Sequence, residues 1–361
     1  MILADAQANA LALLTAEPLD GVVASYNDVN TSIALLQGAT AMIPGTVGLL
    51  RAHAKELGGR RIPFPILPRM DSVEVLDDHI RTQLMAFTWQ ANPAFGKLLK
   101  LITQIPTQPT LYMQITAALQ SPDASVDEIA ELVAHEPAVS AKLLQLVNSP
   151  MLALRGRVTS VRDATSLLGL SRLRSLVLAT CLFRQFNGTK CPSFSMSKFE
   201  ATSVKVAAWA STIAKAESRD KQVADMAFTA SLLHNFGVLL LAANVPDAYE
   251  QVLRKAKEQR VSIAWTELEV FGATHAEVAA AIFASWGIPF SIVNAVGWYP
   301  LPSASEDTTF SPLTAVHAAT AVDTYEQTGM LAYDESYMER LRLSDKVKAW
   351  CETLPTEALA A

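Results

Sequence analysis

The feature that most constrains this sequence is a run of short apolar stripes between residues 105 and 183. Five sets of apolar residues recur there at spacings of three and four: Leu111, Ile115 and Leu119; Val126, Ile129, Ala130 and Val133; Leu143, Leu144 and Val147; Val161, Ala164, Leu167 and Leu168; Leu173, Leu176 and Val177. These spacings place each set on one face of a helix. Helices this short are marginal alone, so they must bury their faces against one another. The stretch therefore predicts an all-α module.

Capping residues divide the stretch where the stripes end. Ser125 stands three positions before Glu128, and Ser160 stands three before Asp163, which is the spacing of a capped helix start. Gly169 lies where the fourth helix should stop. The caps and the stripes thus predict the same helix boundaries.

The chain downstream of this block also has helical periodicity. We predict one continuous apolar helix from Asp225 to Leu241, inside the membrane-like run Met226–Val245. His234 and Asn235 lie within that run and would be costly in hydrocarbon, so a buried core helix is the better interpretation. We predict an all-α domain over residues 93–325 and a helical C-terminal tail over 326–361.

Residues 1–92 have a different texture. Asp20–Ala24 is a short β-type run, Thr46–Leu57 suggests a helix, Arg61–Pro68 is proline-rich and extended, and Ser72–Phe87 suggests another helix. This pattern predicts a small α/β region. The predicted fold class is therefore mainly α, with a small α/β N-terminal domain.

Composition excludes several classes of protein. Half of the 361 residues are hydrophobic and 18% are charged, which indicates a globular chain rather than a disordered one. The formal net charge of −6 disfavours direct nucleic-acid binding, which needs a basic surface. Three cysteines without metal-ligand spacing, and no signal peptide, predict a cytoplasmic protein with reduced thiols.

Seven short blocks carry a family resemblance. They are Ile105-Pro106 with Pro109, then Ser121–Ser125, Glu136–Ser140, Leu143–Ser149, Val158–Val161, Leu167–Leu170 and Arg172–Arg174. In this order and spacing the chain resembles the HDOD family, a bacterial signalling module related to the HD phosphohydrolases. The resemblance extends to about Val322. It implies an HD-like multi-helix fold and a regulatory role with other signalling proteins as partners.

The resemblance also allows a check of the HD metal ligands. In the catalytic relatives a first His, a His-Asp pair and a distant Asp hold a divalent metal that activates water. The matching positions here are Thr202, His234-Asn235 and Thr320, so one of four ligands is kept. We therefore expect no metal, no cofactor and no catalysis. The alternative is a metal-dependent HD-type phosphohydrolase that acts on nucleotides.

Two further groups of residues are candidate sites. His275 and His317 could converge with His234 on the vestigial HD pocket and bind a small ligand such as a nucleotide, although hydrogen-bonded structural histidines are the simpler interpretation. A basic cluster could dock an acidic partner, although solvated helix faces are the simpler interpretation: Arg155, Arg157, Arg162, Arg172 and Arg174, with Asn148 beside them.

The order of elements in residues 1–92 faintly resembles a response-regulator receiver domain that lacks its first strand and helix. A receiver needs an acidic pocket and a phosphoacceptor aspartate after the strand, but Asp20–Ala24 runs into Ser25-Tyr26-Asn27. A phosphorylatable receiver is not expected. An unrelated α/β cap used for packing or protein contact is the alternative.

Overall fold

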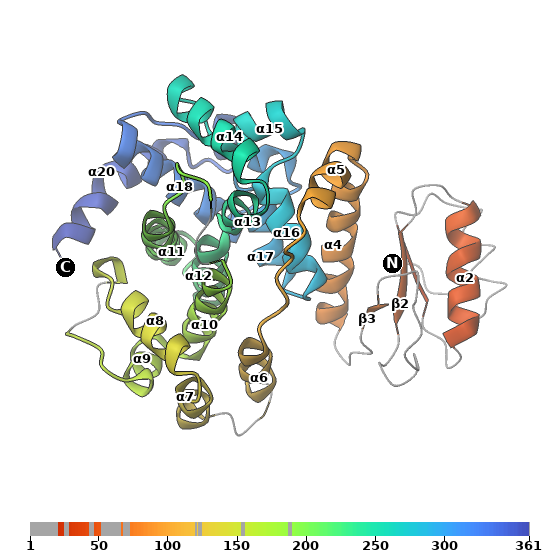
Figure 1. Cartoon of the computed structure of the whole chain (residues 1–361), viewed down its shortest axis with the longest axis horizontal. Coiled ribbons are helices and arrows are strands. Elements are labelled where there is room, and N and C mark those ends of the chain that lie inside the picture. Colours follow the sequence, from red (N-terminus) through yellow and green to blue (C-terminus); the bar gives the residue numbers. More distant parts are fainter. Residues whose placement is uncertain are drawn as a thin grey trace. The chain divides into compact units, whose positions relative to one another are not determined.

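The computed structural model describes residues 21–24, 29–42, 47–51, 66–67, 73–119, 121, 125–152, 156–186 and 190–360. The chain divides into two compact units, Met1–Ala91 and Asn92–Ala361. Figure 1 labels the elements of both units along the chain. Each unit is considered by itself.

The first unit contains a parallel sheet among its described residues. The elements are β1 (Gly21–Ala24), α2 (Val29–Met42), β2 (Val47–Arg51), β3 (Ile66–Leu67) and α4 (Val73–Gln90). The strands are ordered β1-β2-β3, and both pairs are parallel. α2 packs against β1 and β2, and Ala24, Leu36 and Leu50 of these elements are buried.

The helix expected over Thr46–Leu57 is wrong, because its described part is strand β2. β2 lies between β1 and β3. A central strand of a parallel sheet is buried on both faces and reads as a continuous apolar run, which periodicity alone cannot tell from a helix. The sequence also has a helical apolar pattern over Ala6–Leu14, which predicts a helix there, and this stretch lies outside the described residues.

The five predicted helices of the striped block are confirmed. They are α6 (Thr110–Ala118), α7 (Val126–Ala134), α8 (Pro137–Val147), α9 (Val161–Leu168) and α10 (Leu170–Arg184), with a 3-10 turn at Pro150–Leu152. The Ser125 and Ser160 side chains accept from the backbone N–H groups of Glu128 and Asp163, as expected. Gly169 ends α9 with a φ of 82°, a conformation that favours glycine.

Most members of the stripes are buried, but Leu119, Val126, Leu144 and Leu168 are only half-buried and Leu167 is exposed. Leu143, Leu146 and Val147 are buried on α8, whereas Leu144 is only half-buried. On α9, Leu167 is 54% exposed. Spacings of three and four define a face only to within about one residue, so the flank of a stripe is the part that sequence assigns least well.

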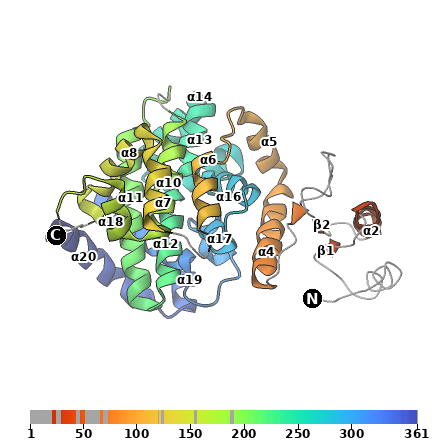
Figure 2. The same cartoon turned by 90° about the horizontal axis from the view of Figure 1, so that it is seen from below.

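The remaining helices complete the second unit. They are α5 (Pro93–Leu101), α11 (Met196–Glu217), α12 (Lys221–Leu233), α13 (Phe236–Asn244), α14 (Pro246–Gln259), α15 (Ile263–Phe271), α16 (His275–Ser285), α17 (Phe290–Trp298), α18 (Pro312–Thr328), α19 (Glu335–Arg340) and α20 (Ser344–Ala360), with a 3-10 turn at Pro302–Ala304. α12 packs against α10, α11, α17 and α18 and forms the centre of the unit. Both ribbon views show α12 surrounded by other helices (Figures 1 and 2).

The apolar stretch Lys221–Asn244 is long and hydrophobic enough to cross a membrane by length and composition, and 83% of its most apolar window is buried inside the protein. The expectation of one continuous helix here is wrong, because α12 ends at Leu233 and α13 begins at Phe236. The His234 ring nitrogen Nδ1 donates to the carbonyl of Ser231, the acceptor that the N–H of Asn235 would use in a continued helix. A side chain that takes a backbone acceptor competes with the helix, and the chain turns at His234-Asn235.

Candidate functional site

The His234-Asn235 turn is the starting point of the site. His234 is 2% exposed, and its Nδ1 lies 2.5 Å from the Ser231 carbonyl oxygen. Burial lowers the pKa of His234 to about 4, so the ring is neutral at pH 7. Because a carbonyl can only accept, Nδ1 carries the proton and Nε2 keeps its lone pair. Among the described residues, Nε2 makes no hydrogen bond.

The Asn235 side chain begins a chain of buried polar contacts. The Tyr299 hydroxyl donates to Asn235 Oδ1 at 3.0 Å and lies 2.6 Å from His275 Nε2. His275 Nδ1 lies 2.6 Å from Glu267 Oε2, and the Tyr249 hydroxyl donates to Glu267 Oε1 at 2.6 Å. We call Asn235, Tyr299, His275, Glu267 and Tyr249 the polar relay. Its members come from the α12–α13 turn, the end of α17, α16, α15 and α14.

The relay is almost entirely enclosed. Glu267 and Tyr249 are 0% exposed, His275 is 2% exposed and Tyr299 is 8% exposed, while Asn235 is half-buried. Burial, reinforced by the Glu267 carboxylate, raises the pKa of both tyrosines well above its ordinary value. Both hydroxyls therefore remain protonated and can act as donors. Asn235 is the least buried member of this set.

Tyr299 is the residue around which the three candidate histidines gather. The His234 ring meets the Tyr299 ring edge-on, with centroids 5.0 Å apart. His317 Nδ1 lies 2.8 Å from the Tyr299 carbonyl oxygen, and His317 Nε2 accepts from the N–H of Asp334 at 2.8 Å. Burial lowers the pKa of His317, which therefore binds two backbone groups as a neutral ring. His234, His275 and His317 thus lie around one tyrosine, and none of them forms a pair with a second histidine.

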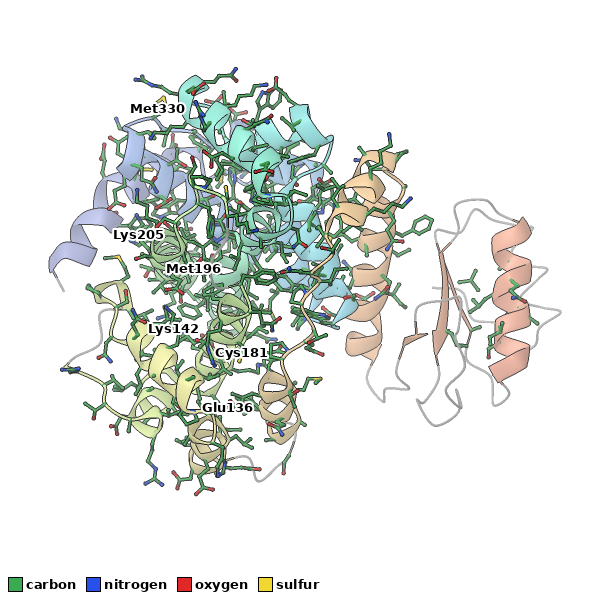
Figure 3. The ribbon with its side chains drawn as sticks, in the orientation of Figure 1. Glu136, Lys142, Cys181, Met196, Lys205 and Met330 are labelled. Atoms are coloured by element: carbon green, nitrogen blue, oxygen red, sulfur yellow. The ribbon has the colours of Figure 1, made fainter. Side chains whose placement is uncertain are left out.

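The two threonine positions contribute no charge to this region. Thr202 on α11 and Thr320 on α18 are both half-buried. The Thr320 hydroxyl donates to the carbonyl of His317, within its own helix. One turn beyond each of them, Lys205 of α11 (Figure 3) contacts the carboxylates of Asp323 and Glu326 on α18. These three charged groups of α11 and α18 therefore bind one another.

These donors do not fit a catalytic divalent metal. The described residues contain no group of three or more His, Cys, Asp and Glu side chains placed to hold one. Asn235 Oδ1, His275 Nε2 and both ring nitrogens of His317 are already used within the protein. His234 Nε2 is the one ring nitrogen of the three histidines that remains available. Two neutral hydroxyls and an amide cannot offset the dehydration of a dication.

The residues of the candidate basic cluster are used in different ways. Asn148 closes the loop after α8, because its amide bonds both the N–H and the carbonyl of Val158. Arg172 bonds Asp225 at 3.0 Å and Ser211 at 2.7 Å, and its guanidinium lies 5.2 Å from the centre of the Phe228 ring. Both side chains therefore have internal structural roles.

The other described arginines of that cluster are less engaged. Arg157 is exposed and Arg174 is half-buried. Arg162 forms an exposed ion pair with Asp127. Arg155 lies outside the described residues. The structure thus divides the cluster into an internal part and an exposed part that contains Arg157 and Arg162.

Comparison with known proteins identifies the family of the chain. The model of the HDOD domain matches residues 105–301, which is more than half of the chain. The chain belongs to the HDOD family. The all-α fold of the second unit is the HDOD fold, and the resemblance inferred from the seven sequence blocks is confirmed.

Solved structures with the same fold include several HDOD-like proteins. An HDOD domain protein of unknown function from Geobacter sulfurreducens is 21% identical, with a TM-score of 0.61 over 80% of this chain and 97% of its own. A putative phosphohydrolase from Shewanella amazonensis SB2B is 22% identical, with a TM-score of 0.55 over 72% and 93%. A putative signal transduction protein from Marinobacter aquaeolei VT8 is 17% identical, with a TM-score of 0.52 over 96% and 88%. At these identities the likeness shows the fold alone.

A curated relative from Treponema pallidum (strain Nichols), an uncharacterized protein, is 24% identical over 213 residues. The match covers 59% of this chain but only 40% of the relative. The chain thus spans less than half of this relative's length.

Sequence reasoning missed three members of the polar relay: Glu267, Tyr249 and Tyr299. Glu267 lies three residues after the buried Ala264, so helical spacing placed it on the inward face of α15. That spacing was the one available signal, because a carboxylate on an apolar face needs a buried partner.

Proposed function

We propose that this HDOD protein is a non-catalytic regulatory protein of bacterial signal transduction that works by binding other signalling proteins. The observation that carries the proposal is the donor set at the HD positions. There, Thr202, Asn235 and Thr320 bring no charge, and the amide oxygen of Asn235 is already bound to Tyr299. HD positions that carry no carboxylate, and an amide oxygen that is already bound, are better suited to holding a fold together than to activating water.

The alternative, a metal-dependent phosphohydrolase acting on nucleotides, has two points in its favour. One similar structure is that of a putative phosphohydrolase. His234 also has the arrangement of many metal-binding histidines, with one nitrogen bound to a carbonyl and the other free. A single such ligand is weak support for a catalytic centre.

Elemental analysis and an activity assay separate these two functions. The purified full chain is analysed for iron, manganese, magnesium and zinc, and then assayed with added Mn²⁺ on bis-(p-nitrophenyl) phosphate and on cyclic nucleotides. We expect substoichiometric metal and no turnover. Stoichiometric metal together with turnover that His234→Ala abolishes would establish the hydrolase instead.

The exposed part of the basic cluster is the surface we propose for an acidic partner. Arg157 and Arg162 remain candidates there, whereas Arg172 and Asn148 are used within the fold. Full-length protein carrying Arg157→Glu and Arg162→Glu should lose partners captured by the parent from a lysate of its own cells. Arg254→Glu is the matched control, since Arg254 is an exposed arginine paired with Glu258 on α14. Equal capture by all three proteins would exclude this surface.

A nucleotide ligand is a second candidate, favoured by the free Nε2 of His234 beside the half-buried amide of Asn235. A ligand that binds only the folded state raises the melting temperature. Thermal shifts with a panel of cyclic dinucleotides test this, and a shift that persists in His234→Ala would place the ligand elsewhere.

For the first unit we propose a small α/β domain that is receiver-like but not phosphorylated. The sequential parallel order β1-β2-β3 is that of the last three strands in the 2-1-3-4-5 doubly wound sheet. Ser25, Tyr26 and Asn27, which follow the first strand, lie outside the described residues. Incubation with acetyl phosphate should leave the mass of the chain unchanged.

We also propose that the protein resides in the cytoplasm. Cys181, Cys191 and Cys351 are all free thiols. Burial raises the pKa of each to about 11, so none is poised for disulfide exchange. Fractionation of the native cells tests this location.

A further inference from the structure

The positions of the protons in the polar relay follow from which atoms can donate. Asn235 Oδ1 can only accept, so the Tyr299 O–H donates to it. The hydroxyl proton of Tyr299 then lies in the bond to Asn235. The 2.6 Å contact between the Tyr299 oxygen and His275 Nε2 therefore needs a proton on Nε2. At the other end, a Glu267 carboxylate can only accept, so His275 Nδ1 also carries a proton. With both nitrogens protonated, His275 is an imidazolium.

The surroundings of Glu267 favour this charged state. Glu267 is 0% exposed, and a lone carboxylate at that depth is costly. Its oxygens accept from the Tyr249 hydroxyl, the N–H of His275 and His275 Nδ1. An imidazolium beside it makes the pair neutral overall, and both carboxylate oxygens accept hydrogen bonds, which is the condition under which a buried ion pair is tolerated.

The opposite orientation of the Asn235 amide would change the charge. With Nδ2 toward Tyr299, the amide would donate to the phenol oxygen, and the Tyr299 proton would turn to His275 Nε2. Nε2 must then release its own proton to solvent, and His275 becomes a neutral ring with its proton on Nδ1. Rotation of one amide is thus coupled to the loss of one proton from the core, and it leaves Glu267 without a counter-charge.

We propose that the polar relay is a proton-coupled device in which the orientation of the Asn235 amide sets the charge of the His275–Glu267 pair. Asn235 is half-buried on the α12–α13 turn, whereas the pair lies between α15 and α16. A molecule that turned the Asn235 amide would therefore alter the electrostatics of a region built from α14, α15, α16 and α17. The device goes beyond the proposed binding function and does not depend on any partner.

Other titratable groups near His275 are few and do not supply its charge. His234, at the end of α12, is neutral at pH 7 because burial lowers its pKa to about 4. Glu277, on the same helix as His275, accepts from the N–H and the hydroxyl of Thr274, and burial raises its pKa. α13, which packs onto α16, carries no titratable residue, and its Gly237 lies directly against the His275 backbone. Glu267 is therefore the counter-charge.

Nitrogen-15 NMR of the histidine rings in the full chain tests the device at pH 7, with His275→Gln to assign the signals. We expect protonated-type shifts for both ring nitrogens of His275, and one protonated nitrogen each for His234 and His317. Asn235→Leu removes the acceptor, so the Nε2 shift of His275 should move to the unprotonated range. Asn235→Asp keeps an obligate acceptor and should leave His275 doubly protonated.

Asn294→Leu is the matched control, because Asn294 is a buried amide on α17 that bonds Asp307 outside the relay. It should leave the His275 signals unchanged, and unchanged His317 signals report a folded core in every variant. An unprotonated Nε2 in the parent would overturn the charged pair even if Asn235→Leu fails to fold. Retention of both protons in a folded Asn235→Leu would overturn the role of the amide.

Discussion

At the residue scale, the packing of the HDOD core depends on a few positions where close contacts allow only one type of residue. Gly237 is one of them, because a Cβ built there would lie 1.9 Å from the carbonyl oxygen of His275. Only glycine lets α13 approach the start of α16 so closely. This approach places His275 within reach of the α12–α13 turn.

We therefore predict that Gly237→Ala destabilises the protein by roughly 3 kcal/mol or more, as an overpacked core does. Urea unfolding followed by circular dichroism measures the change. Gly96→Ala is the control, since nothing lies within 4 Å of a Cβ at that position inside α5. There the gain in helix propensity should leave stability unchanged or raise it by about 0.5–1 kcal/mol. Equal losses in both variants would refute the close approach.

The buried histidines predict a dependence of stability on pH. The pKa of His234 is about 4 in the folded protein, below its ordinary value of 6.5. As the pH falls below 6.5, His234 binds a proton in the unfolded chain but not in the folded one. The contribution of His234 to the free energy of unfolding is therefore fully present above pH 6.5 and declines toward pH 4. The contribution of His234 is roughly 3 kcal/mol.

The free energy of unfolding measured in urea at pH 7, 6, 5 and 4 tests this dependence. His234→Gln should show a shallower decline than the parent, because one of the protons is no longer taken up on unfolding. His317, whose pKa burial also lowers, keeps part of the slope. An identical slope in parent and variant would contradict the buried neutral state of His234.

At the element scale, ion pairs of the same chemistry stabilise the fold to different degrees, because they differ in burial. Arg172 and Asp225 join α10 to α12 with side chains 19% and 14% exposed, whereas Arg162 and Asp127 join α9 to α7 at 63% and 57%. The guanidinium of Arg172 also lies over the Phe228 ring. Removal of one partner from a mostly buried pair leaves the other charge buried without a partner.

Arg172→Ala should accordingly cost about 2–4 kcal/mol, somewhat less than for a fully buried pair. Arg162→Ala should leave the unfolding midpoint unchanged, because water screens an exposed pair. Chemical unfolding of both variants, with Asp225→Ala as the reciprocal change, measures the difference. A large effect of Arg162→Ala would mean that this surface is more enclosed than its exposure indicates.

The helix faces give a second test at this scale. Leu176 on α10 is 0% exposed, so Leu176→Asp should unfold the second unit by placing a charge in its core. Leu144→Asp should be milder, because Leu144 lies half-buried at the edge of α8. Circular dichroism and gel filtration distinguish a folded from an unfolded chain, and equal effects would show that the two faces are misassigned.

At the scale of the whole molecule, the C-terminal helices are part of the helical unit. Tyr337, Met338, Val347 and Cys351 are all buried, and α20 packs against α18. The Thr314 hydroxyl bonds the Tyr337 hydroxyl at 2.8 Å, and the N–H of Asp334 bonds His317. Loss of α19 and α20 would uncover both the apolar face of α18 and a ring nitrogen of His317.

A fragment of residues 92–361 should therefore unfold cooperatively, whereas a fragment of residues 92–325 should be less stable and prone to aggregate. Side-by-side urea titration and light scattering measure both properties. Equal stability of the two fragments would mean that α19 and α20 contribute no packing energy.

The sequence alone determined the helical character of the second unit. Stripes at spacings of three and four, serine caps and Gly169 are local features, so α6–α10 and the family blocks could be read directly. The absence of a His or Asp at Thr202, Asn235 and Thr320 is likewise a property of residue identity and needed no coordinates.

Tertiary structure decided the rest, because it depends on which distant segments meet. Leu50 lies in a strand rather than a helix because β1 and β3 flank it on either side. Glu267, His275 and Tyr299 stand 8 and 24 residues apart in the chain and become one hydrogen-bonded set only when α15, α16 and α17 pack together. Arg172 and Arg162 look alike in sequence, but burial beside Asp225 and Phe228 gives one a structural role and leaves the other on the surface.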